Sequence, residues 1–182
     1  MLKLLRLTPA QWHLLIRADL ATGITNVAEW MYLTDAEPED VIILGADSLI
    51  RATTADGTPT AVMFIRNRPA PDMHIHLTTK GTEQVRKHIY PQYRILRYLD
   101  NFRHIQIPLK HLYKTTNDLD NLRALDELGL IEVITRTGGQ PRTVPLASIR
   151  VSQLTGEEGR QPMWLVSSTA AGRPYAAGED LF

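Results

Sequence analysis

The chain has 182 residues, of which 43% are hydrophobic and 22% are charged, and its formal net charge is zero. This length allows one medium domain or two small ones, and the absence of cysteine excludes disulfides, thiol catalysis and thiolate metal sites. No apolar run approaches the roughly 20 residues that a membrane helix needs, so we expect no membrane contact, and the composition fits a cytoplasmic protein.

The charges are segregated along the sequence. Residues 18–50 contain seven acids and no lysine or arginine, whereas residues 51–114 contain eleven lysines and arginines against four acids. A neutral chain with charges separated in this way can still present a strongly positive face.

The first fifty residues predict three helices. Thr8 and Pro9 open the first one, because threonine caps a helix and proline suits its first turn. Apolar residues at helical spacing follow over residues 12–20, 27–31 and 41–49.

Residues 51–77 predict two strands around a tip, with turn signals at Asp56-Gly57 and at Pro69-Ala70-Pro71. The segment "HIHLTTKG" alternates histidine with apolar residues, as in a half-buried strand, and then enters a helix. This Leu-Thr-x-x-Gly ending resembles the last wing strand of winged-helix domains, and "LTPAQWHLL" resembles the first helix of regulators of the MarR type. The winged-helix resemblance covers residues 1–88, with the MarR-like features in residues 8–88.

Residues 89–155 predict a second set of similar elements. The segment "QYRILRYLDNF" predicts a helix, "IPLKHLYKTT" a short helix, "NDLDNLRALDELGLIEVI" a helix that ends at Gly129 and enters a strand, and "TVPLASIRVSQL" the returning strand. Within them, "LRALDELGLIEV" resembles the third helix and first wing strand of many winged helices, which extends the resemblance to residues 91–154. No strict sequence repeat relates the two halves. The expected fold is therefore α+β with tandem winged helix-turn-helix domains, and the alternative is a single α/β domain.

Residues 156–182 predict an extended, partly disordered tail, because glycine, alanine, serine and proline become frequent there. The apolar segment "MWLV" is expected to dock on the second domain. The terminal "GEDLF" resembles short peptides that dock on replication proteins, although Gly178 stands where the sliding-clamp peptide carries glutamine, and a mobile tail is the alternative.

The winged-helix resemblance implies that the third helix of a domain enters the major groove while the wing contacts the DNA backbone. The third helix of the first domain carries Glu39, Asp40 and Asp47 and no base, so we expect it to face a protein partner or solvent. In the second domain, Arg123 could read guanine and Asn117 or Asn121 adenine. An ordinary solvated helix face is the alternative for that helix.

Arginines and lysines elsewhere predict phosphate contacts. Arg136 and Arg142 flank the glycine tip of the second wing. Arg94 and Arg97 share a helix face with Asn101 and His104, opposite an apolar face of Ile95, Leu96, Leu99 and Phe102, and Arg86 and Lys87 precede this helix. A solvated cationic face is the alternative interpretation of this pattern.

Catalytic and metal motifs are not found. His74 and His76 share a strand face without a third ligand at metal-site spacing, so we expect solvent-facing histidines of a wing strand. We therefore predict a non-enzymatic protein that needs no cofactor or metal and binds double-stranded DNA, as a homodimer, in the control of transcription or replication. The alternative is a protein-interaction module, similar to the small winged-helix subunits of chromosome-organising SMC complexes.

Overall fold

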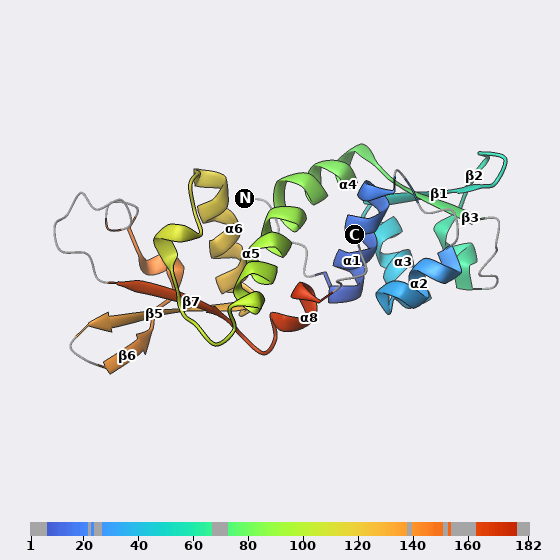
Figure 1. Ribbon diagram of the computed structural model, residues 1–182. Coiled ribbons are helices and arrows are strands. Elements are labelled where there is room, and N and C mark those ends of the chain that lie inside the picture. Colours follow the sequence, from blue (N-terminus) through green and yellow to red (C-terminus); the bar gives the residue numbers. More distant parts are fainter. Residues whose placement is uncertain are drawn as a thin grey trace. The chain divides into compact units, whose positions relative to one another are not determined.

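The computed structural model describes residues 7–21, 23, 27–66, 73–137, 140–150, 153 and 163–177. It is an α+β protein with two small antiparallel sheets (Figure 1). The described chain divides into two compact units, which we call the N-terminal unit, Leu7–Tyr90, and the C-terminal unit, Pro91–Ala177.

The N-terminal unit begins with three helices, as the apolar spacing predicted. Its elements are α1 (Pro9–Leu20), α2 (Val27–Thr34), α3 (Pro38–Ala46), β1 (Ile50–Thr54), β2 (Pro59–Thr60), the 3-10 helix η1 (Val62–Arg66), β3 (Met73–Leu77), α4 (Thr79–Gln84) and the π-helical turn η2 (Val85–Ile89). The Thr8 side chain accepts a hydrogen bond from the backbone N–H of Gln11 and Pro9 occupies the first turn, so the predicted start of α1 is confirmed. The expectation of two strands around a tip was too simple, because the segment forms three strands in the order β2-β1-β3 and the helix η1.

The C-terminal unit follows with a second helical and sheet layer. Its elements are α5 (Tyr90–Asn101, which starts at the unit boundary), β4 (Ile107–Pro108), the 3-10 helix η3 (Leu109–His111), α6 (Thr116–Glu127), β5 (Ile131–Thr137), β6 (Gln140–Thr143), the 3-10 helix η4 (Leu146–Ser148), β7 (Trp164–Ser168) and α8 (Arg173–Ala176). The strand order is β4-β7-β5-β6.

Three expectations for this region were wrong. Residues 107–116 form a strand and one 3-10 turn instead of a helix, and the described part of 143–154 contains η4 instead of the returning strand. The strand that returns along β5 is the shorter β6, which ends at Thr143, and the later strand β7 pairs with both β4 and β5 in the middle of the sheet. The described part of the expected tail, residues 163–177, is thus built into the fold, while "GEDLF" lies outside the described residues.

The two units repeat one another, although no sequence repeat was apparent. Adding 81 to the residue numbers of α1, Pro9–Leu20, gives those of α5, Tyr90–Asn101. Gln11 and Gln92, at the same position in these two helices, are both buried. Gln11 Nε2 donates a hydrogen bond to Asp40 Oδ1 at 2.9 Å, and Gln92 Nε2 donates one to Asn121 Oδ1 at 2.9 Å. Because Asp40 and Asn121 also differ by 81, one tertiary hydrogen bond occurs in both units.

The helix ends repeat at the same spacing. The N–H of Leu49 bonds to the carbonyl of Leu44, and the N–H of Leu130 bonds to that of Leu125, each at 2.9 Å. The residue before each leucine, Ser48 or Gly129, has a positive φ, 58° and 70° respectively. Both α3 and α6 therefore end in the left-handed turn that closes a helix and leads into a strand.

A Thr-x-x-Gly motif closes each unit. The N–H groups of Thr78 and Thr169 bond to the carbonyls of Leu49 and Leu130, each at 3.0 Å, and each threonine hydroxyl accepts from the glycine three residues later. A Cβ on Gly81 would lie 2.0 Å from the Leu49 oxygen, and one on Gly172 would lie 2.1 Å from the Leu130 oxygen. Glycine is therefore required by close backbone approach in both motifs. The two motifs lie 91 residues apart, ten more than the helices. Paired residues of β5 and β7 are ten residues farther apart in the sequence than the corresponding residues of β1 and β3.

The sheets and the second helices complete the comparison of the two units. β1 pairs with β3 with Ala52 opposite Ile75, and β5 pairs with β7 with Val133 opposite Val166, which is the same register. The second helix differs, because the eight-residue α2 packs on α1 whereas the corresponding stretch of the C-terminal unit holds only the one-turn η3.

Candidate nucleic-acid interface

The surface of the C-terminal unit is rich in cations. Among its described residues, two acidic residues are exposed, Asp120 and Glu127. Seven lysines and arginines are exposed there: Arg94, Arg103, Lys110, Lys114, Arg142, Arg150 and Arg173. The N-terminal unit shows no such excess, because its described surface exposes four such cations (Arg51, Lys80, Arg86 and Lys87) against five acids (Asp35, Glu37, Glu39, Asp56 and Glu83).

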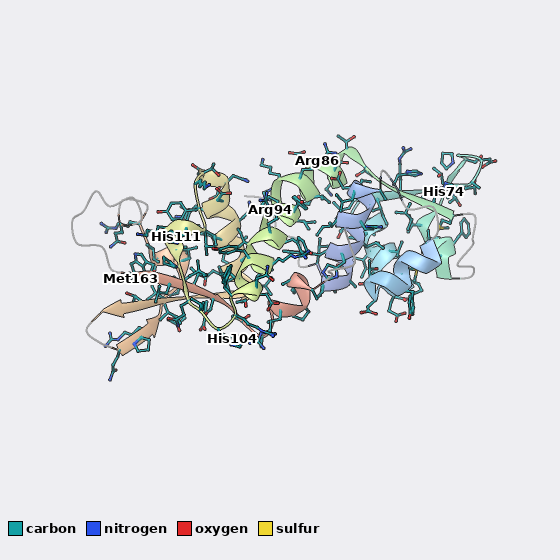
Figure 2. The ribbon with its side chains drawn as sticks, in the orientation of Figure 1. His74, Arg86, Arg94, His104, His111 and Met163 are labelled. Atoms are coloured by element: carbon teal, nitrogen blue, oxygen red, sulfur yellow. The ribbon has the colours of Figure 1, made fainter. Side chains whose placement is uncertain are left out.

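Helix α5 exposes much of the face that its sequence predicted, but Arg97 and Phe102 depart from that expectation. Its buried residues are Gln92, Tyr93, Leu96 and Leu99, so Arg94 is exposed as expected (Figure 2). Arg97 is half-buried, and its Nη1 donates a hydrogen bond to the Tyr93 hydroxyl at 3.0 Å. Phe102 was expected to face the core, but it is 40% exposed and lies against the exposed ring of Tyr98. The exposed line along this helix is therefore Arg94, Tyr98 and Phe102, with Asn101 and His104 also exposed.

Helix α6 offers only part of the predicted base-reading set, because Asn117 is exposed whereas Asn121 is not. Asn121 is only 1% exposed, and its amide accepts from Gln92 and donates to the carbonyl of Asn117 at 2.9 Å. It therefore cannot reach an adenine edge, which corrects the sequence interpretation. Ala124 on the same helix is also buried. Arg123 is half-buried, with Nη1 3.6 Å from Asp120 Oδ1.

The strands β5 and β6 form an arginine-bearing ribbon. All four residues of β6 are exposed, and Arg142 lies opposite Thr135 of β5. Arg136 lies on β5 opposite Pro141, and its side chain is outside the described residues, as are the tip glycines. Within the described part of the chain, neither Arg94 nor Arg142 forms an ion pair with a carboxylate.

The predicted site residues of the N-terminal unit have other surroundings. Arg86 is exposed on η2 (Figure 2), and its Nη2 lies 3.2 Å from Asp19 Oδ1 of α1. Lys87 is exposed on the same turn. Asp40, part of the acidic third helix, accepts hydrogen bonds from Thr8 Oγ1, Gln11 Nε2 and the N–H of Glu37. Asp40 therefore holds α1 and α3 together, while Glu39 remains exposed.

The histidine pair on β3 is packed more closely than solvent-facing histidines would be. His74 and His76 are half-buried with ring centroids 6.4 Å apart, and His76 Nε2 lies 3.3 Å from the hydroxyl of Thr53. A Cβ on Gly23 would lie 2.6 Å from His76 Nδ1. Among the described residues, no three histidine or acidic side chains are placed to hold a metal ion.

The pKa values of three side chains in the C-terminal unit are shifted by their structural surroundings. The backbone N–H of Lys114, with further hydrogen bonds from Thr115, lowers the pKa of Asp118 at the start of α6, and burial raises the pKa of Tyr113 and of Tyr175. Asp118 receives the N–H of Thr115 at 2.9 Å, so it completes the capping box of this helix.

Within the described residues, no helix has both the length and the apolar character to cross a membrane. No family model matches the chain, and neither the curated proteins nor the solved structures include a match.

Proposed function

We propose that the chain is a non-enzymatic protein of the tandem winged-helix type that binds double-stranded DNA through its C-terminal unit. Each unit has a first helix, a third helix that ends in a left-handed turn, and a sheet in which the first and last strands pair. This order of elements is similar to a winged helix, with the ribbon β5–β6 in the place of a wing.

The excess of exposed cations on the C-terminal unit carries this proposal. DNA presents a regular array of phosphates, and lysines and arginines that neutralise them release condensed counterions. Arg94 and Arg142, which are exposed and outside any ion pair among described residues, are the best placed to make such contacts. We assign Arg136 to the same set because of its place on β5.

The proposed contacts are made mainly with the DNA backbone. Helix α6 contains four acids, Asp118, Asp120, Asp126 and Glu127, against the single base Arg123, so phosphates would repel it in a major groove. Because Asn121 is buried as well, we infer little discrimination between DNA sequences. The resemblance to MarR-type regulators supports a homodimer acting in transcription or replication control, and sedimentation analysis tests the dimer.

The test is an anisotropy titration of the full chain with labelled random duplex at two salt concentrations. The affinity should fall with salt at a logarithmic slope of about −0.9 per phosphate neutralised. Replacing Arg142 with alanine should weaken all duplexes alike and reduce the slope by about one, whereas Arg51→Ala on β1 should change neither. Absence of duplex binding at about 50 mM salt would contradict the proposal.

A second candidate function is a protein-interaction module, and the surface of α3 and η1 favours it. These elements pack together, since a Cβ on Gly45 would lie 3.0 Å from a Val62 methyl. They expose the large apolar side chains Ile43, Met63 and Phe64 next to the acid Glu39. Loss of partner capture by Phe64→Ala, with duplex binding unchanged, would assign this second function to the N-terminal unit.

A further inference from the structure

We infer that the exposed line of α5, formed by Arg94, Tyr98 and Phe102, is a stacking platform for single-stranded DNA. This inference rests on the proposed DNA-binding function but assigns a different contact, with unpaired bases instead of the duplex backbone. The rings of Tyr98 and Phe102 are 43% and 40% exposed, and their centroids lie 5.0 Å apart at an interplanar angle of 56°.

The Arg94 end of the platform is exposed in the unit whose second helix is reduced. In the N-terminal unit α2 packs on α1, and His13, Leu14 and Ile16 are buried. In the C-terminal unit the one-turn η3 stands in place of α2, and the counterparts of these three residues are exposed or half-buried: Arg94, Ile95 and Arg97. The same three helix positions are thus buried in one unit and exposed or half-buried in the other.

The charges of the segment that carries the rings favour a polyanion as the occupant. From residue 94 to residue 114 the sequence contains one acid, the half-buried Asp100. Over the same stretch Arg94, Arg103, Lys110 and Lys114 are exposed. An acid-poor surface with two contacting aromatic rings fits phosphates beside bases, since every base has a face that can stack on an aromatic side chain.

The rings distinguish single-stranded from double-stranded DNA. Bases in a duplex are already paired and stacked, so Tyr98 and Phe102 gain nothing from it, whereas unpaired bases can lie on the rings. Ile105, whose N–H bonds to the carbonyl of Phe102 at 2.7 Å, is a further apolar residue of this segment and is 59% exposed.

The experiment is an anisotropy titration of the full chain with a labelled oligothymidylate of about 15 nucleotides, with a labelled duplex in parallel. Tyr98→Ala and Phe102→Ala should each weaken oligothymidylate binding by roughly 5- to 100-fold and leave duplex binding unchanged. Tyr98→Phe keeps the ring and should bind like the native chain. Tyr32→Ala, which removes an 83% exposed tyrosine from the N-terminal unit, is the matched control and should have no effect.

The outcomes separate the two proposals. If the native chain binds duplex but not oligothymidylate, the platform is overturned and the duplex proposal stands. Unchanged oligothymidylate affinity in both alanine variants would also overturn the platform. Binding to neither DNA would overturn both. If circular dichroism shows that Tyr98→Ala is unfolded, Tyr98→Leu keeps an apolar side chain without an aromatic ring and must show the same loss. Tighter binding of oligouridylate than oligothymidylate would overturn the assignment to DNA.

Discussion

Two buried glutamines, Gln11 and Gln92, each join the first helix of a unit to the third by one hydrogen bond. In the C-terminal unit the acceptor is Asn121, whose own amide hydrogens are used by the carbonyl of Asn117. Both polar side chains are almost fully enclosed, where buried polar groups are normally hydrogen-bonded.

Asn121→Ala should therefore destabilise the protein by about 1–3 kcal/mol, because it leaves the buried amide of Gln92 unpaired. Urea unfolding measures this change. Asn117→Ala is the control, since it keeps the backbone carbonyl and alters an exposed side chain. The folded Asn121→Ala protein should bind duplex as the native protein does, and a selective loss of binding would restore Asn121 as a DNA contact.

The prediction that Asn121 reads a base was wrong for a physical reason. The leucines at helical spacing in α6 lie inward, since Leu119, Leu122 and Leu125 are buried and Leu128 is half-buried. However, a helix packed on two sides buries more than one stripe, and the polar Asn121 is enclosed because Gln92 satisfies it. Sequence periodicity alone could not show that pairing.

At the scale of single elements, the two arginines that the sequence placed on one face of α5 have different surroundings. Arg94 is exposed, whereas Arg97 is half-buried and bonded to the hydroxyl of the buried Tyr93. Arg94→Ala should shift the free energy of unfolding by no more than about 0.5 kcal/mol. Arg97→Ala should cost about 1 kcal/mol, because Tyr93 loses a hydrogen-bond partner. Thermal or urea unfolding of the two variants measures this difference, and equal stabilities would show that the hydrogen bond to Tyr93 contributes nothing.

Helix α6 should depend on pH through its cap. Asp118 has a lowered pKa in the folded protein, mainly through the N–H of Lys114, so its stabilising effect is present above the ordinary value of 3.8 and is lost as the pH falls through the lowered value. Asp118→Asn should reduce the acid dependence of unfolding in this window. Asp120→Asn, which removes an exposed acid from the same helix without a capping bond, should keep it, and identical acid profiles for the native chain and Asp118→Asn would contradict this assignment.

The element order was predicted best where a local motif defines an end. Thr8-Pro9 identified the start of α1, and Thr78-Thr79-Lys80-Gly81 identified the passage from β3 to α4. The equivalent motif at Thr169 was missed because Ser168 stands where Leu77 stands in the first motif. The strands β5 and β7 pair although they are far apart in the sequence, so no local motif predicts their pairing.

At the scale of the whole molecule, charge is divided between the two units. Residues 7–90 contain seven lysines and arginines and ten acids, whereas residues 91–177 contain eleven and eight. The neutral chain therefore consists of one acidic and one basic unit, and the DNA binding that we propose would draw on the charge of the basic unit.

Substitution of Gly81 or Gly172, the glycines of the two Thr-x-x-Gly motifs, tests whether the two units unfold independently. Gly81→Ala and Gly172→Ala each force a Cβ against a backbone oxygen, so each should destabilise its own unit by about 1–3 kcal/mol or more. Hydrogen exchange should show lost protection on β1 and β3 for Gly81→Ala, and on β5 and β7 for Gly172→Ala. Gly129→Ala is a milder comparison, because nothing lies within 4 Å of its Cβ position and only its φ of 70° opposes alanine. Equal loss in both sheets from either glycine variant would mean that the units unfold together.

The 81-residue spacing lets the chain be aligned with itself. Leucine occurs in both copies at Leu15 and Leu96 and at Leu44 and Leu125, and isoleucine at Ile50 and Ile131, all of them buried. Agreement at these buried positions indicates what the shared backbone arrangement requires. His13 and Arg94 differ at one such spacing, and the first helix is covered at this position in one unit and exposed in the other.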